Sequence, residues 1–277
     1  MLQMKSPKKK YILKPQKQTF LDIVRRLKKE PIEFSEFLDL LENISDKFYE
    51  NSELEFELLL INGFPLDIKD DFVYLRTTKT PICEQTFCFV DIETNGGSPK
   101  NGHQIIELGA VKYKNGQILD KFDSLVFAKE IPIYIQEVTN ISLDMLQTAP
   151  RLEKVLKEFK EFLGDDVFVA HDIKFDYNFI SDSFEKYNLG KLLNRKICTI
   201  DLSKRCIQSQ KYGLSTLKEL LNIDVQNHHR AYFDALSTEI IFERCLENID
   251  FSKIKSTEDL IAFSKSNNIL KFPKENN

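Results

Sequence analysis

The chain has 277 residues, of which 42% are hydrophobic and 30% charged, and its net charge is −4. This composition excludes a disordered or collagen-like chain, and the negative charge argues against a protein that binds mainly by coating a phosphate backbone. At this length we expect one catalytic domain and a smaller companion. The five cysteines are scattered and form no C-x-x-C pair, which argues against a disulfide framework or a zinc site.

The N-terminal residues 1–16 predict a mobile basic arm, because they contain Pro7 and Pro15 and show no periodicity. Up to Lys29 the chain carries ten Lys or Arg and a single acid, Asp22. The arm is either a solvated tail or a contact for nucleic acid or a partner. Because no apolar run has the length of a membrane helix or a signal peptide, we expect a cytoplasmic protein without membrane contact.

Residues 17–80 predict a small helical domain. Apolar residues at helical spacing indicate three helices within residues 19–63. Alternation over residues 66–75, interrupted by a turn at Asp70, then predicts a β-hairpin. Three helices followed by a hairpin resemble a winged helix, and the alternative is a small helical cap without nucleic-acid contact. Residues 77–81 have the composition of a linker.

Residues 84–248 have the pattern of an α/β domain. We expect an antiparallel meander of three strands at 87–92, 105–113 and 118–127, with Asn115 and Gly116 in its second turn. Helices and short strands follow, with helices expected at 150–164, 175–187, 214–221 and 231–245 and strands at 167–170 and 196–199. Residues 249–277 predict one more helix, which starts with a capping box at Ser256, and a polar tail.

The strongest chemical signal is a pair of carboxylates at the end of the first strand of this domain. Asp91 and Glu93 follow the apolar residues Phe87 to Val90 and, two residues apart, point to the same side of a strand. Two such carboxylates beside a core repel each other unless a cation neutralises them. Mg²⁺ and Mn²⁺ prefer all-oxygen ligands of this kind. A D-x-E pair also arises by chance on exposed faces, and the preceding apolar run favours the metal site.

Two further segments carry acids next to short apolar stretches. Asp176 follows the strand at 167–170 and, taken alone, is typical of a carboxylate at a helix N-terminus. His229 stands just before the last long helix, and Asp234 lies in the early turn of that helix, flanked by Ala235. Small residues beside a carboxylate allow a ligand or a second backbone to approach closely.

Together these three segments resemble the DEDDh exonuclease family over residues 86–245. The sequences F-V-D-I-E-T-N-G, H-D-x-x-F-D and H-R-A-x-x-D-A match the three family motifs in the correct order. Within the family the chain is most similar to the epsilon proofreading subunits of bacterial replicative polymerases. The resemblance implies a ribonuclease H-like fold, in which helices flank a mixed sheet.

The resemblance also implies a chemistry. Asp91, Glu93, Asp176 and Asp234 are expected to hold two divalent ions, Mg²⁺ or Mn²⁺, and His229 to act as the general base. The five-residue spacing to Asp234 favours His229 over His228, which we expect to be an exposed loop residue.

The family further suggests residues near the substrate. Thr94, Glu107 and Thr139 are expected to lie at the terminal nucleotide, although Glu107 could equally be an inward carboxylate with a structural partner. His171 is expected to be structural and His103 to be solvated. Asp172 departs from the family, in which Asn is common at this position, and it adds a charge near the metals.

Three functions follow from these residues. The first is removal of nucleoside monophosphates from a single-stranded or frayed DNA 3′ end, in proofreading or repair, with a DNA polymerase subunit as a partner. The second is trimming of RNA by the same chemistry, because the site reads sugar and backbone and not base identity. The third is a non-catalytic module that binds nucleic acid or a polymerase, against which the retention of all four acids and the histidine argues.

Overall fold

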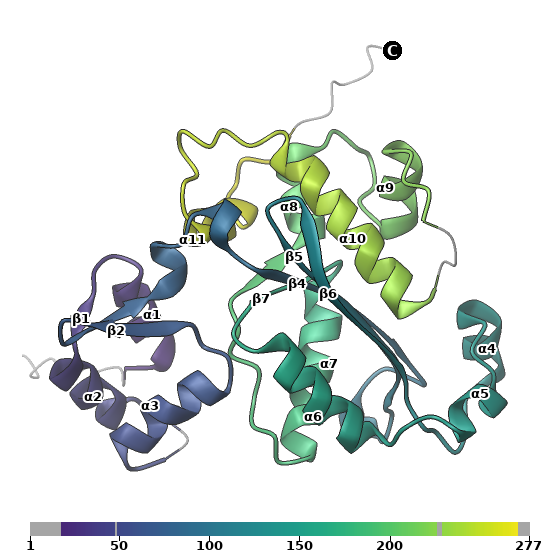
Figure 1. Ribbon diagram of the computed structural model, residues 1–277, viewed down its shortest axis with the longest axis horizontal. Coiled ribbons are helices and arrows are strands. Elements are labelled where there is room, and N and C mark those ends of the chain that lie inside the picture. Colours follow the sequence, from purple (N-terminus) through teal and green to yellow (C-terminus); the bar gives the residue numbers. More distant parts are fainter. Residues whose placement is uncertain (1–17, 48, 226–228, 271–277) are drawn as a thin grey trace, which may run out of the picture.

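A computed structural model describes residues 18–47, 49–225 and 229–270. These residues contain two sheets, one of three strands near the N-terminus and one of five strands in the rest of the chain (Figure 1). No helix in the three ranges combines the length and the apolar character needed to cross a bilayer. The expected basic arm, residues 1–16, lies outside the described residues.

The N-terminal part has the topology of a winged helix. Its elements in chain order are α1 (Phe20–Leu27), β1 (Ile32–Glu33), α2 (Phe34–Asn43), α3 (Ser52–Ile61), β2 (Leu66–Lys69) and β3 (Phe72–Leu75). The strands form an antiparallel sheet in the order β1-β3-β2. Asp70 and Asp71, with φ angles of 51° and 62°, make the predicted turn between β2 and β3. Contact of this part with nucleic acid stays a prediction.

The five-stranded sheet confirms the predicted mixed α/β fold. Its strands are β4 (Phe87–Thr94), β5 (Ile105–Lys114), β6 (Gln117–Leu125), β7 (Val167–Ala170) and β8 (Lys196–Cys198), in the order β6-β5-β4-β7-β8. β4, β5 and β6 pair antiparallel, whereas β7 and β8 continue the sheet parallel to β4. The turn between β5 and β6 is made by Asn115 and Gly116, with φ angles of 48° and 78°.

Helices cover both faces of this sheet. The helices of this part of the chain are α4 (Ile133–Thr139), α5 (Leu143–Gln147), α6 (Leu152–Leu163), α7 (Ile173–Lys186), α8 (Thr199–Cys206), α9 (Leu214–Leu220), α10 (Ala231–Leu246) and α11 (Thr257–Ser264). Short 3₁₀ turns lie at Arg76–Thr78, Ile82–Glu84 and Pro99–Asn101. One face packs against α6 and α7, and the other packs against α8, α9, α10 and α11.

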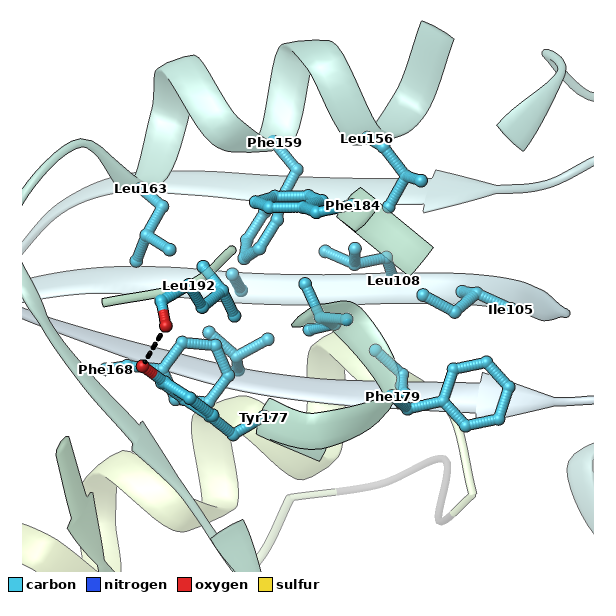
Figure 2. Packing of buried hydrophobic residues seen from close by; sticks show 14 of the residues in the cluster. Ile105, Leu108, Leu156, Phe159, Leu163, Phe168, Tyr177, Phe179, Phe184 and Leu192 are labelled. Atoms are coloured by element: carbon cyan, nitrogen blue, oxygen red, sulfur yellow. Dashed lines mark hydrogen bonds between the residues drawn. The ribbon is translucent and has the colours of Figure 1, made fainter. Parts of the chain in front are cut away.

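Alternate residues of β4 enter the two opposite cores. Cys88 and Val90 pack with Phe159 of α6 and Phe184 of α7 in the core that Figure 2 shows. The hydroxyl of Tyr177 in the same core donates a hydrogen bond to the carbonyl of Leu192 at 2.8 Å (Figure 2).

On the other face of the sheet, Phe87 and Phe89 contact Phe242 of α10, with ring centroids 4.8 and 5.2 Å apart. Because side chains two residues apart share a face, Asp91 and Glu93 lie on the α10 side of the sheet.

Gly109 of β5 allows α10 to approach the sheet closely. A Cβ atom at this position would lie 2.1 Å from the backbone nitrogen of Tyr232 and 2.3 Å from the carbonyl carbon of Ala231. Gly109 is also the partner of Asp91 in the register of β4 and β5. The first turn of α10 therefore lies directly beside the strand end that carries Asp91.

The segment expected to be a linker, residues 77–81, is packed against α11. The side chain of Thr77 is 1% exposed, and its hydroxyl donates to Glu258 at 3.0 Å. Glu258 also pairs with Arg195 at 2.5 Å and with Lys28 at 2.8 Å. These contacts connect the N-terminal part, the residue before the edge strand β8, and α11. Residues 77–81 are therefore packed against α11, and their role as a linker and the domain boundaries stay predictions.

Candidate active site

Asp91 and Glu93 lie at the carboxyl end of β4, which continues through Thr94. Both side chains are partly exposed, in contrast to the buried residues Phe87 to Val90 that precede them. The register between β4 and β5 shifts between Glu93 and Thr94. The strand therefore ends with its two carboxylates at the rim of the core, as the alternation of the sequence predicts.

Asp176 reaches the same place from the first turn of α7. Its side chain is 4% exposed, and its Oδ1 accepts a hydrogen bond from the backbone N–H of Ile92 at 3.2 Å. Ile92 stands between Asp91 and Glu93, so this bond holds α7 against the acidic end of β4.

Asp234 comes from the first turn of α10 and is 5% exposed. Its Oδ2 accepts a hydrogen bond from the backbone N–H of His229 at 3.0 Å. His229 has an exposed side chain and a φ angle of 60°. One ligand atom each from Glu93, His229 and Asp234 lie within 4.8 Å of one another.

Burial and mutual repulsion shape the electrostatics of the four carboxylates. Burial, together with the charges of Asp176 and Glu93, raises the pKa of Asp91 well above its ordinary value. Burial and the charge of Asp234 raise the pKa of Glu93 to about 8. The pKa of Asp176 is also raised to about 8, mainly by burial.

This site therefore holds more negative charge than its surroundings neutralise, and a cation would relieve the repulsion. The donor atoms are carboxylate oxygens with the imidazole of His229 beside them, a set that suits hard divalent ions and contains no thiolate. The residues fit the divalent metal ions that the resemblance to the exonuclease family implies.

The metal-free protein should gain stability when Glu93 is replaced by Gln. The folded-state pKa of about 8 lies above the ordinary 4.5. Below pH 4.5 Glu93 is protonated in both the folded and the unfolded state, so its charge does not affect the free energy of unfolding. From pH 4.5 to about pH 8 the unfolded state ionises more readily than the folded state, which destabilises the folded state increasingly. We expect Glu93→Gln to raise the melting temperature by about 2–6 °C at pH 8 and by clearly less at pH 5.5, both in chelator. A melting temperature unchanged or lowered at pH 8 would contradict this account.

The acids open into a cleft of about 290 Å³. Its walls are formed by Asp91, Ile92, Glu93, His171, Asp172, Phe175, Asp176, Leu214, Ser215, His229 and Asp234. The structure thus brings together all five residues predicted to carry the chemistry. Phe175, whose side chain is 41% exposed, was not predicted as a site residue. Its position next to Asp176 in the sequence could have indicated that it lies in the cleft.

The three residues predicted to contact the substrate do not line this cleft. The hydroxyl of Thr94 donates to the carbonyl of Gly96 at 2.8 Å. Thr139 is 1% exposed at the end of α4, where its hydroxyl donates to the carbonyl of Ile135. A role for either residue at the substrate stays a prediction.

Glu107 has a structural partner, which is one of the two alternatives that the sequence left open for this residue. It is 1% exposed, and its Oε1 accepts hydrogen bonds from Arg230 at 2.6 and 2.8 Å. Its Oε2 accepts from the backbone N–H of Ala231 at 2.9 Å. Glu107 thus binds the start of α10, which carries Asp234, and a substrate contact stays a prediction.

His171 has the structural surroundings that the sequence predicts. Its Nδ1 lies 2.9 Å from the hydroxyl of Thr199, and its Nε2 donates to the carbonyl of Tyr212 at 2.9 Å. Burial lowers the pKa of His171 to about 4, so the ring is neutral at pH 7. Asp172, the residue before α7, has a φ angle of 67°, a left-handed conformation that Asn and Asp adopt more readily than most residues.

The prediction of a solvated His103 is wrong. Its side chain is half-buried, and its ring packs on Gly96, where an added Cβ would lie 2.2 Å from the ring. The missing Cβ of Gly96 makes room for the ring, a contact that the loop composition does not reveal. His228 lies outside the described residues.

The fold and the acidic cleft define a nuclease of the ribonuclease H-like class. Residues 88–242, more than half of the chain, match the model of the family described as "Exonuclease". The chain belongs to this exonuclease family, and the resemblance predicted from the motifs is confirmed.

A curated relative and two solved structures illustrate the similarity. The chain is 37% identical to a PolC-type DNA polymerase III of Staphylococcus haemolyticus over 206 residues, 73% of this chain but only 14% of that polymerase. Exonuclease X with a 5′-overhanging DNA duplex matches 64% of this chain and 99% of its own, with 22% identity and a TM-score of 0.51. The nuclease domain of 3′hExo, bound to rAMP, matches 59% of this chain and 92% of its own, with 18% identity and a TM-score of 0.51. At these identities the two solved structures show the fold alone.

Proposed function

We propose that the chain is a metal-dependent 3′–5′ exonuclease, which hydrolyses the terminal phosphodiester of DNA and releases nucleoside monophosphates. The convergence of four carboxylates from β4, α7 and α10 with His229 on one cleft carries this proposal. A passive binding module has no need for buried acids whose repulsion destabilises the protein.

The residues have separate roles in this proposal. Asp91, Glu93 and Asp234 would hold one divalent ion, Mg²⁺ or Mn²⁺, and Asp91 and Asp176 a second. The bound ions would supply electrostatic stabilisation of the charge that develops on the phosphate oxygens. His229 takes the proton of the attacking water, a role suited to an exposed imidazole beside the acids. Asp176 and Glu107 hold α7 and α10 against the sheet, so the acids stay in place.

DNA is the preferred substrate in this proposal because the 37% identical relative is a DNA polymerase III. Replicative proofreading or repair, with a polymerase subunit as partner, follows from the same similarity. The chain spans 14% of that polymerase, so the proposal concerns the exonuclease step alone. RNA is the second candidate, supported by the similarity in fold to a nuclease domain bound to rAMP.

A direct comparison of substrates tests the proposal. Single-stranded DNA, duplex DNA with a 3′ mispair and RNA of the same sequence are labelled at the 5′ end and incubated with Mg²⁺ or Mn²⁺. We expect stepwise shortening from the 3′ end, fastest for single-stranded or mispaired DNA. Faster shortening of RNA would assign the chain to RNA trimming, and binding without any cleavage would support the passive module.

Activity is expected to require a divalent ion, because burial and mutual repulsion raise the pKa of the converging carboxylates Asp91, Glu93 and Asp176, and a bound cation would relieve this repulsion. Exhaustive chelation should abolish cleavage, and Mg²⁺ or Mn²⁺ should each restore it without added zinc. Cleavage is measured by gel electrophoresis of a 5′-labelled oligonucleotide. Elemental analysis establishes that chelation has removed the metal from the protein. Full activity of this metal-free protein would rule out the metal-dependent mechanism.

A further inference from the structure

The third helix of the N-terminal part is unsuited to a phosphate backbone, although the part has the topology of a winged helix. α3 carries Glu53, Glu55 and Glu57 and no Lys or Arg. Glu53 and Glu57 are exposed, so this helix would repel a phosphate backbone. Any contact of the N-terminal part with nucleic acid therefore has to lie on another face.

A basic face lies beside the hairpin of β2 and β3. Two hollows of about 570 and 130 Å³ share Tyr74 and Lys79 in their walls. Among the described residues, these walls contain two acids, Glu30 and Asp67, and five cations, which are Lys28, Lys29, Lys69, Arg76 and Lys79. The chain as a whole has a net charge of −4, so this face differs in sign from the average surface.

The acids in these walls do not neutralise the lysines. Glu30 and Asp67 each pair with an arginine, at 3.8 and 3.6 Å. Lys29, Lys69 and Lys79 are exposed and form no ion pair with any carboxylate that the structure describes. Three ammonium groups are therefore available on this face to bind an anionic partner.

The basic face continues onto the nuclease part at α11, which lies beside the N-terminal part (Figure 1). The carboxylate of Glu258 pairs with both Lys28 and Arg195. Burial and the charges of Arg195 and Lys28 lower the pKa of Lys265, the residue after α11. The charges of Glu258 and Asp201 oppose this shift but do not cancel it. Positive charge thus exceeds negative charge here as well.

Aromatic side chains accompany the lysines on the hairpin. Phe72 and Tyr74, two residues apart on β3, share one face of the strand, and Phe72 is 41% exposed. Lys69 of β2 stands opposite Phe72 in the register of the two strands. Unpaired bases stack on aromatic rings, while lysines bind the phosphates between them. This combination suits a single strand better than a duplex, whose bases are already stacked on one another.

We propose that a basic track binds a single strand of the substrate nucleic acid and that Phe72 and Tyr74 stack its bases. The track consists of Lys28, Lys29, Lys69, Lys79, Arg195 and Lys265. It lies outside the acidic cleft, so it raises the affinity for the strand and takes no part in the hydrolysis. This inference rests on the proposed function, in which the substrate is nucleic acid.

Binding of a fluorescent single-stranded DNA of about 30 nucleotides to the full chain in chelator tests the track without cleavage. We expect the double variant Lys29→Gln, Lys79→Gln to raise Kd about 10-fold and to make the dependence of log Kd on log salt concentration shallower by about 1.4. Tyr74→Leu should raise Kd about 10-fold, and Tyr74→Phe, which keeps the ring, should bind like the wild type.

The double variant Lys154→Gln, Lys157→Gln is the matched control, because it removes the same charge from the exposed surface of α6. It should bind like the wild type. Melting curves establish that each variant is folded, and Phe72→Leu replaces Tyr74→Leu if the latter is unfolded. In cleavage assays the Lys29→Gln, Lys79→Gln variant should raise KM for the same strand and leave kcat unchanged.

Wild-type affinity in the Lys29→Gln, Lys79→Gln variant or in Tyr74→Leu, or an equal loss in the control, would overturn the inference. So would a wild-type chain that does not bind the strand in chelator. If the variants lose affinity for polyglutamate while DNA binding is intact, the track serves an acidic protein and the inference is wrong. If the wild-type chain cleaves no nucleic acid, the proposed function fails, while the titrations in chelator still decide whether the track binds a single strand.

Discussion

Replacing Asp91 or Asp234 by alanine is expected to abolish turnover while the fold survives. Asp91 and Glu93 lie at the end of β4, and Asp234 faces this strand end from the first turn of α10. Each variant removes a predicted ligand of a divalent ion, and the ion contributes several kcal/mol of transition-state stabilisation. Since each 1.4 kcal/mol is a factor of ten in rate, we expect kcat to fall by roughly 10³-fold or more.

The fold should tolerate these substitutions because they relieve repulsion within the acidic cluster. Burial and neighbouring acids raise the pKa of Asp91, so its charge destabilises the metal-free protein. Circular dichroism and melting curves should therefore show a folded protein. Asp120→Ala, which removes an exposed acid on β6, is the control and should cleave at the wild-type rate. Normal cleavage by either active-site variant would show that the assignment of the site is wrong.

The second large effect is expected for His229→Ala. A positioned general base contributes about 10²- to 10⁴-fold to the chemical step, and the variant should lose a factor in this range. The neighbouring variant His228→Ala should lose little. Rates are measured in single turnovers with saturating Mg²⁺, so that neither metal binding nor product release limits them.

Both histidine variants should still bind metal, because the four carboxylates remain. Titration of Mn²⁺ binding checks this expectation and separates loss of the base from loss of the ion. The neighbour acts as an internal control for changes in the loop. If His228→Ala proves the impaired variant, or if both variants cleave normally, the role assigned to His229 is wrong.

Local sequence patterns predicted most of the fold. Short, largely apolar segments located the five strands of the main sheet, and the paired residues Asn115 and Gly116 located the turn between β5 and β6. The capping box at Ser256 forms as expected, with Asp259 as its third helical residue. By contrast, β1 and the helices α4, α5 and α8 were not predicted. A strand of two residues has no measurable alternation, and helices of five to eight residues show little more than two turns of periodicity.

The sequence by itself determined which residues are proposed to carry the chemistry, because Asp91 and Glu93 share a strand face and all three motifs occur in order. Only the tertiary structure decided how these residues are held. The bond from Ile92 to Asp176 joins residues 84 positions apart, and Glu107 meets Ala231 across 124 positions. Such partners depend on which strands are neighbours and on how closely α10 packs on Gly109. Periodicity describes one element at a time, so it reports which face a side chain occupies but not which distant residue meets it there.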